Sequence, residues 1–131
     1  MAYNILVVDD SKTIRSIIIK TLRLTKLEIG EILEAGNGKE ALTCLENNWI
    51  DLVLSDLNMP VMSGVEMVEV MAENGLLNDI PVVVVSTDGS ATRIEELKKK
   101  GIRAYIRKPF TPESIGEIIE KVLGVINAKS D

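Results

Sequence analysis

Five short apolar runs alternate along the chain with longer segments in which apolar residues recur at helical spacing. The runs occupy residues 5–8, 31–35, 52–55, 82–85 and 102–106. The first, third and fourth runs are almost wholly apolar, which is typical of parallel strands that are covered on both faces. The second run, EILEA, is more polar, and we interpret it as an edge strand.

Each run is followed by a segment whose apolar positions share one helical face. We expect helices over residues 11–25, 38–48, 64–74, 90–100 and from Pro112 toward Ile126. Gly75 and Gly101 suit helix ends, and Pro112 after Thr111 suits a first helical turn. The alternation predicts an α/β fold of the (βα)5 type, which is a doubly wound parallel sheet of five strands with helices on both faces. We expect a single domain over residues 1–131.

Composition narrows the class of protein. The net charge of −5 disfavours nucleic-acid binding, because phosphate backbones repel an acidic chain. No apolar run approaches the ~18 residues of a membrane span, and the N-terminus lacks a basic cluster, so we expect a cytoplasmic protein without a signal peptide. Cys44, the only cysteine, is expected to fill space in the core. The lysines at 98–100 are interpreted as a solvated helix end.

Polar residues end four of the five predicted strands. They are Asp9 and Asp10, then Asp56, then Ser86 and Thr87, and finally Lys108. In a parallel sheet these positions fall on one edge, where such folds bind their ligands. Each residue alone has an ordinary interpretation, for example as a helix cap at Asp10 or Ser11 or as a surface charge at Lys108. Their agreement at four strand ends favours a functional site.

Three carboxylates at one edge repel one another. A pair about 4 Å apart costs about 4 kcal/mol at an effective dielectric constant of 20. A divalent cation relieves that repulsion, and oxygen ligands without histidine favour Mg²⁺ or Mn²⁺ over zinc. A cation, a lysine, a hydroxyl and a carboxylate nucleophile together are suited to phosphoryl transfer onto the carboxylate.

Four strings along the chain carry a family resemblance: ILVVDDS at 5–11, LVLSDLNMPVMSG at 52–64, PVVVVST at 81–87 and AYIRKPF at 104–110. With these strings the sequence resembles the receiver domains of two-component signalling, and most closely the single-domain, CheY-like chemotaxis regulators. The resemblance covers residues 4–126. It implies a flavodoxin-like sheet with strand order 2-1-3-4-5.

The resemblance also implies a role for each site residue. Asp56 is the expected phosphoacceptor. Asp10 is the expected direct ligand of Mg²⁺, Asp9 reaches the ion through water, and the main-chain carbonyl of Asn58 is a third protein ligand. Lys108 is expected to bind a phosphoryl oxygen, and its peptide bond to the next residue, a proline, is expected to be cis.

Further residues are expected to switch or tune the domain. Ser86 resembles the hydroxyl that turns toward the phosphoryl group, and Tyr105 resembles the aromatic residue that then moves from exposed to buried. Thr87 departs from the small residue usual at its position. Asn58 and Asp88 occupy positions that in this family tune hydrolysis of the aspartyl phosphate.

Partners follow from the same resemblance. A sensor histidine kinase is the expected phosphodonor, and a downstream protein is expected on the face built from the fourth helix, fifth strand and fifth helix. A phosphatase is a further candidate partner, and neither nucleic acid nor membrane is expected. We expect a monomer that acts as a signalling domain, with only self-catalysed phosphoryl transfer and autodephosphorylation as its chemistry. A flagellar motor switch, a phosphorelay and a regulated enzyme all stay open as outputs, with chemotaxis favoured.

Two other classes of protein are alternatives to a receiver domain. A flavodoxin-like cofactor module needs a phosphate-cradling loop after the first strand, where this chain has Asp9, Asp10 and Ser11. A phosphatase with an aspartyl nucleophile needs two aspartates spaced two residues apart on that strand, whereas Asp9 and Asp10 are adjacent. Both alternatives fit the residues less well than a receiver domain.

Overall fold

A parallel sheet of five strands in the order β2-β1-β3-β4-β5 forms the centre of the molecule. The structure is a computed structural model and describes residues 2–87 and 90–124. The strands are β1 (Tyr3–Val8), β2 (Ile29–Ala35), β3 (Leu52–Ser55), β4 (Val82–Ser86) and β5 (Ala104–Arg107). The predicted fold class and strand order are confirmed, and β2 lies at an edge as its polar sequence indicated.

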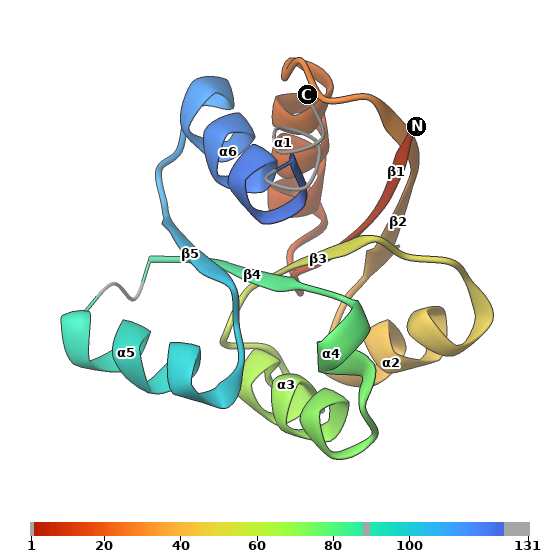
Figure 1. Ribbon diagram of the computed structural model, residues 1–131, viewed down its shortest axis with the longest axis vertical. Coiled ribbons are helices and arrows are strands. Elements are labelled where there is room, and N and C mark those ends of the chain that lie inside the picture. Colours follow the sequence, from red (N-terminus) through yellow and green to blue (C-terminus); the bar gives the residue numbers. More distant parts are fainter. Residues whose placement is uncertain (1, 88–89, 125–131) are drawn as a thin grey trace.

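Helices cover both faces of the sheet (Figure 1). They are α1 (Lys12–Arg23), α2 (Gly38–Asn47), α3 (Gly64–Glu73), α4 (Leu76–Asp79), α5 (Ala91–Lys100), α6 (Pro112–Ile119) and the π-helix η1 (Glu120–Gly124). α1 and α6 pack on one face, and α2, α3, α4 and α5 lie on the other. None of the helices in the described part of the chain is long and apolar enough to span a membrane.

Side chains of the central strands alternate between two buried clusters. In β1, Leu6 and Val8 join the cluster under α2, α3 and α5, whereas Ile5 and Val7 join the cluster under α1 and α6. All four side chains have no exposed surface. Two-sided burial therefore explains why β1, β3 and β4 are nearly continuous apolar runs.

Each of the five longer helices begins with a capping side chain that accepts a hydrogen bond from the backbone three residues on. These caps are Ser11, Asn37, Ser63, Ser90 and Thr111. Such caps satisfy backbone N–H groups that have no partner inside the helix. The predicted start of the last helix at Pro112, with Thr111 as its cap, is confirmed. Because these helices follow strands, their capped ends lie near the edge at which the strands end.

The structure also differs from the sequence prediction at several element boundaries. β1 and β2 begin two residues earlier than predicted, and β5 begins at Ala104 instead of residue 102. The short helix α4 was not predicted, because four residues show no helical period. The α-helical part of the last helix ends at Ile119, and Ile126 lies outside the described residues. The lysines at 98–100 are exposed in the last turn of α5, as expected.

Candidate functional site

The register of the sheet brings the polar strand ends together. Val8 of β1 pairs with Ser55 of β3, so the next residues, Asp9 and Asp56, also lie on neighbouring strands. The Asp56 N–H continues the ladder and donates to the Val8 carbonyl at 3.0 Å. On the other side of the site, the Lys108 N–H donates to the Ser86 carbonyl at 2.9 Å. Residues that are far apart in sequence thus reach one edge of the sheet.

Three carboxylates form a compact acidic cluster at this edge. Asp9, Asp10 and Asp56 each place one carboxylate oxygen within 4.8 Å of the others. Asp9 is buried, Asp56 is half-buried and Asp10 is exposed, so the cluster opens to solvent on the side of Asp10. Oxygen donors at this spacing fit a hard divalent cation such as Mg²⁺. Asn58 lies exposed two residues after Asp56, and its carbonyl remains a predicted ligand.

Lys108 supplies positive charge to the cluster. Its Nζ atom lies 3.3 Å from Asp9 Oδ2 and 3.7 Å from Asp56 Oδ2. The Lys108 side chain is only 17% exposed, so solvent screens these ion pairs less than it would at the open surface. The Lys108–Pro109 peptide bond is cis, as the resemblance implied. The ammonium group therefore bridges two of the three carboxylates.

Main-chain N–H groups hold the other oxygens of Asp9 and Asp56. The Ser11 N–H donates to Asp9 Oδ1 at 2.9 Å, and the Leu57 N–H donates to Asp56 Oδ1 at 2.7 Å. Ser11 also caps α1, so its ordinary interpretation as a helix cap is correct. These contacts fix the direction in which each carboxylate points.

The surroundings of Asp56 oppose its ionisation on balance. Burial raises the pKa of the Asp56 carboxyl above its ordinary value of 3.8, and the negative charge of Asp9 adds to this effect. Hydrogen bonds from Leu57 N–H and the Ser86 hydroxyl, together with the Lys108 ammonium, lower the pKa but do not outweigh burial. Ionisation of Asp56 in the folded chain is therefore unfavourable, and a bound cation would make it less so.

That shift predicts a pH-dependent stability difference between the natural chain and Asp56→Asn in the absence of metal. A carboxyl whose pKa is raised on folding adds stability only when protonated, so its contribution is lost as the pH rises through the folded-state pKa. We therefore expect the natural chain to gain stability relative to the variant as the pH falls from neutrality toward 3.8. Urea unfolding in the presence of a chelator measures this difference, and a difference that is constant with pH would contradict the prediction.

The predicted switch residues lie on β4 and β5. Ser86 is 2% exposed, and its hydroxyl hydrogen-bonds the Asp56 carboxyl. Tyr105 is half-buried against the core cluster under α5, and its hydroxyl oxygen is buried without a hydrogen-bond partner among the residues that the structure describes. Thr87, which directly follows β4, is exposed. Asp88 lies outside the described residues.

Sequence reasoning missed two residues that shape the site. Arg15 of α1 donates from Nη1 to the Asp9 main-chain oxygen at 2.6 Å. Gly64, the first residue of α3, lies so close to the backbone of Asp56 and Leu57 that a Cβ there would overlap the Asp56 carbonyl oxygen. No hydrophobic period marks such contacts, although a glycine directly after a helix cap is a weak signal of close packing.

Cys44 is half-buried against the core, as expected, and burial raises the pKa of its thiol.

Comparisons with known proteins agree with this geometry. The response regulator receiver domain family matches residues 5–120. The chain is 40% identical over 121 residues to a chemotaxis protein CheY homolog of Campylobacter jejuni, covering 92% of each protein. It is also 40% identical to chemotaxis protein CheY1 of Helicobacter pylori, covering 92% of this chain and 96% of the relative. The structure of CheY4 from Vibrio cholerae superposes with a TM-score of 0.82 at 31% identity, over 93% of this chain and 99% of that one. The chain therefore belongs to the family of response regulator receiver domains.

Proposed function

We propose that this receiver domain accepts a phosphoryl group on Asp56 from a sensor histidine kinase and passes the signal on by protein contact. The observation that carries the proposal is the acidic cluster of Asp9, Asp10 and Asp56, whose oxygens lie within 4.8 Å, with Lys108 Nζ at 3.7 Å from Asp56. Capping and core packing explain none of these contacts between residues that are distant in sequence. The relatives named as chemotaxis proteins favour chemotaxis as the pathway.

The proposed reaction is an in-line displacement at phosphorus. A carboxylate oxygen of Asp56 forms the new bond to phosphorus, while the bond from phosphorus to the donor imidazole nitrogen breaks and its electron pair stays on that nitrogen. Asp9 and Asp10, with Asp56 and the Asn58 carbonyl, would hold Mg²⁺ or Mn²⁺, which when bound neutralises charge on the phosphoryl oxygens. Lys108 would neutralise the charge that develops on a further oxygen.

The switch is proposed to run from Ser86 to Tyr105. A phosphoryl group on Asp56 would bring up to two negative charges and three acceptor oxygens to the site. The Ser86 hydroxyl, which hydrogen-bonds Asp56, would follow these acceptors. The hydroxyl of Tyr105 has no hydrogen bond to any described residue, so no polar contact within that part of the chain would oppose movement of the ring. Movement of this ring would change the surface between α5 and β5.

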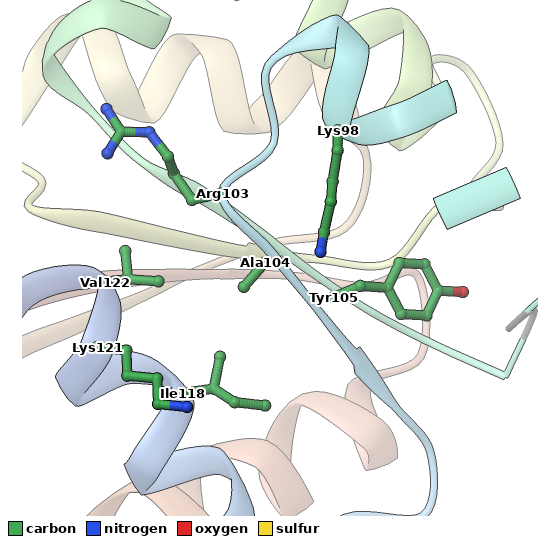
Figure 2. A pocket seen from close by; sticks show the side chains of 7 residues that line it. All are labelled: Lys98, Arg103, Ala104, Tyr105, Ile118, Lys121 and Val122. Atoms are coloured by element: carbon green, nitrogen blue, oxygen red, sulfur yellow. The ribbon is translucent and has the colours of Figure 1, made fainter. Parts of the chain in front are cut away.

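A groove of about 470 Å³, lined mainly by residues of α5, β5, α6 and η1, supports the predicted output surface. Figure 2 shows the apolar side chains of Ala104, Ile118 and Val122 in its lining. Lys98 of α5, Arg103 directly before β5 and Lys121 of η1 contribute basic side chains to the lining, although the Arg103 guanidinium points away from the others in Figure 2. Tyr105 of β5 also lines the groove. A downstream protein with an acidic, partly apolar segment would match this combination. The proposed switch residue thus lies in the proposed docking groove.

Acetyl phosphate, a small phosphodonor, tests the proposed function directly. In the presence of Mg²⁺ we expect the intact mass of the natural chain to increase by one phosphoryl group, and we expect Asp56→Asn to show no gain. Asp79→Asn changes an exposed carboxylate of α4 and should be modified like the natural chain. A gain in mass of one phosphoryl group in Asp56→Asn would contradict the assignment of Asp56 as the acceptor.

A further inference from the structure

Arg15 links three elements beside the acidic cluster. From its place on α1 it donates through Nη1 to the main-chain oxygen of Asp9, at 2.6 Å, and through Nε to Glu34 Oε1 of β2, at 2.9 Å. The Arg15 side chain is 16% exposed, whereas that of Glu34 is 44% exposed. One planar guanidinium therefore fixes the end of β1 and an edge-strand carboxylate at the same time. The proposed reaction gives this residue no role.

The carbonyl that Arg15 binds belongs to the peptide group between Asp9 and Asp10. A peptide group is planar, so holding its oxygen also sets the direction in which the chain continues to the Asp10 Cα atom. Asp9 has its own side-chain anchors in the Ser11 N–H and Lys108. Among residues 2–87 and 90–124, by contrast, no hydrogen bond or ion pair fixes the exposed Asp10 carboxylate. The position of Asp10 therefore depends on its backbone.

We propose that Arg15 is a positioning residue that raises the affinity of the acidic cluster for a divalent cation by fixing the Asp9–Asp10 peptide group. The inference rests on the proposed function, because it concerns the same metal site. Glu34 neutralises the guanidinium, so Arg15 acts by geometry and differs in this from Lys108, whose ammonium contacts the carboxylates themselves. Groups that orient metal ligands in this way typically change metal affinity by about 10–100-fold when they are removed.

Lysine at position 15 separates geometry from charge. It keeps the positive charge, but its single ammonium group cannot reproduce the two-pronged contact of a guanidinium. If Arg15 acted only through its charge, Arg15→Lys would bind Mg²⁺ like the natural chain, and Arg15→Ala would bind it more tightly because a nearby cation is lost. A positioning role predicts that both variants bind Mg²⁺ more weakly.

The test is the Mg²⁺ dissociation constant of the full chain, measured by isothermal titration calorimetry. We expect it to rise about tenfold in Arg15→Lys and at least as much in Arg15→Ala. Arg23→Lys makes the same replacement at an exposed position in the last turn of α1 and should leave the constant unchanged. Urea unfolding identifies any variant that is not folded. If Arg15→Ala does not fold, Arg15→Lys decides the question, and Glu34→Gln, which keeps an acceptor for Arg15, should bind Mg²⁺ nearly as the natural chain does.

Phosphorylation of the natural chain and of Arg15→Lys tests the proposed function, on which the role of Arg15 rests, separately from that role. Arg15 does not touch the reacting groups, so Arg15→Lys should approach the natural rate with acetyl phosphate once Mg²⁺ is saturating. An unchanged or smaller dissociation constant in Arg15→Lys, in a natural chain that is phosphorylated normally, would overturn the positioning role alone. Failure of the natural chain to take up a phosphoryl group would instead reject the proposed function.

Discussion

Gly64→Ala is expected to lower the free energy of unfolding and to suppress phosphorylation of Asp56 together. A methyl group at this position would overlap the Asp56 carbonyl oxygen and lie 3.1 Å from the Leu57 Cα atom. Both are backbone atoms, which cannot rotate away as a side chain can. The Gly64 N–H also donates to the Leu57 carbonyl at 2.9 Å, so α3 cannot withdraw without losing that bond. The loop that carries the acceptor residue must therefore shift.

We expect this overpacking to cost about 1–3 kcal/mol in urea unfolding. The intact mass after treatment with acetyl phosphate and Mg²⁺ reports the second effect, because a displaced Asp56 no longer meets Asp9 and Lys108 in the geometry described. Gly116→Ala is the matched control. Inside α6 a new methyl group would lie 3.4 Å from Thr25 Cγ2, an ordinary contact, and alanine favours a helix over glycine by about 1 kcal/mol. Natural stability and natural phosphorylation in Gly64→Ala would contradict the packing argument.

Hydrophobic period predicted the arrangement of elements well and their boundaries less well. β3 occupies the predicted residues 52–55, because each of its side chains is buried and the run is bounded by aspartates. The apolar character of Ile102 predicts that it belongs to the fifth strand, but its burial has another cause. Its N–H donates to the Leu97 carbonyl across the left-handed Gly101, so Ile102 completes the end of α5. A pattern of apolar residues cannot distinguish a buried strand from a buried helix cap.

The site was predictable where it depends on strand order and not where it depends on local backbone geometry. Asp9, Asp56 and Lys108 each follow a recognisable apolar strand, so the parallel fold alone places them at one edge. Val61 shows the opposite case. It adopts a positive φ of 67° in a tight turn in which the Met62 N–H donates to the Pro60 carbonyl at 2.7 Å. A β-branched residue is rarely found in that conformation, so nothing in the sequence pattern indicates this turn in the loop after Asp56.

Lys108→Ala is expected to change phosphorylation and metal binding in opposite directions. The ammonium group lies 3.3 Å from Asp9 and 3.7 Å from Asp56, so it competes with a divalent cation for the same negative charge. Its removal should strengthen Mg²⁺ binding, since three carboxylates are left without that cation. The transferring phosphoryl group would at the same time lose a positive partner, and removing one such group from a site typically slows a reaction by about 100–1,000-fold.

The two quantities can be measured on one preparation, with calorimetry for the Mg²⁺ dissociation constant and mass spectrometry for the rate with acetyl phosphate at saturating Mg²⁺. Lys121→Ala removes an exposed lysine of the proposed output groove and should leave both unchanged. If Lys108 were needed only to hold the carboxylates together, the variant would bind Mg²⁺ more weakly, and its rate would recover once the ion was saturating. Tighter binding combined with a slow rate at saturation arises only if the ammonium acts on the phosphoryl group itself. That combination separates a lysine that serves the reaction from one that serves the fold.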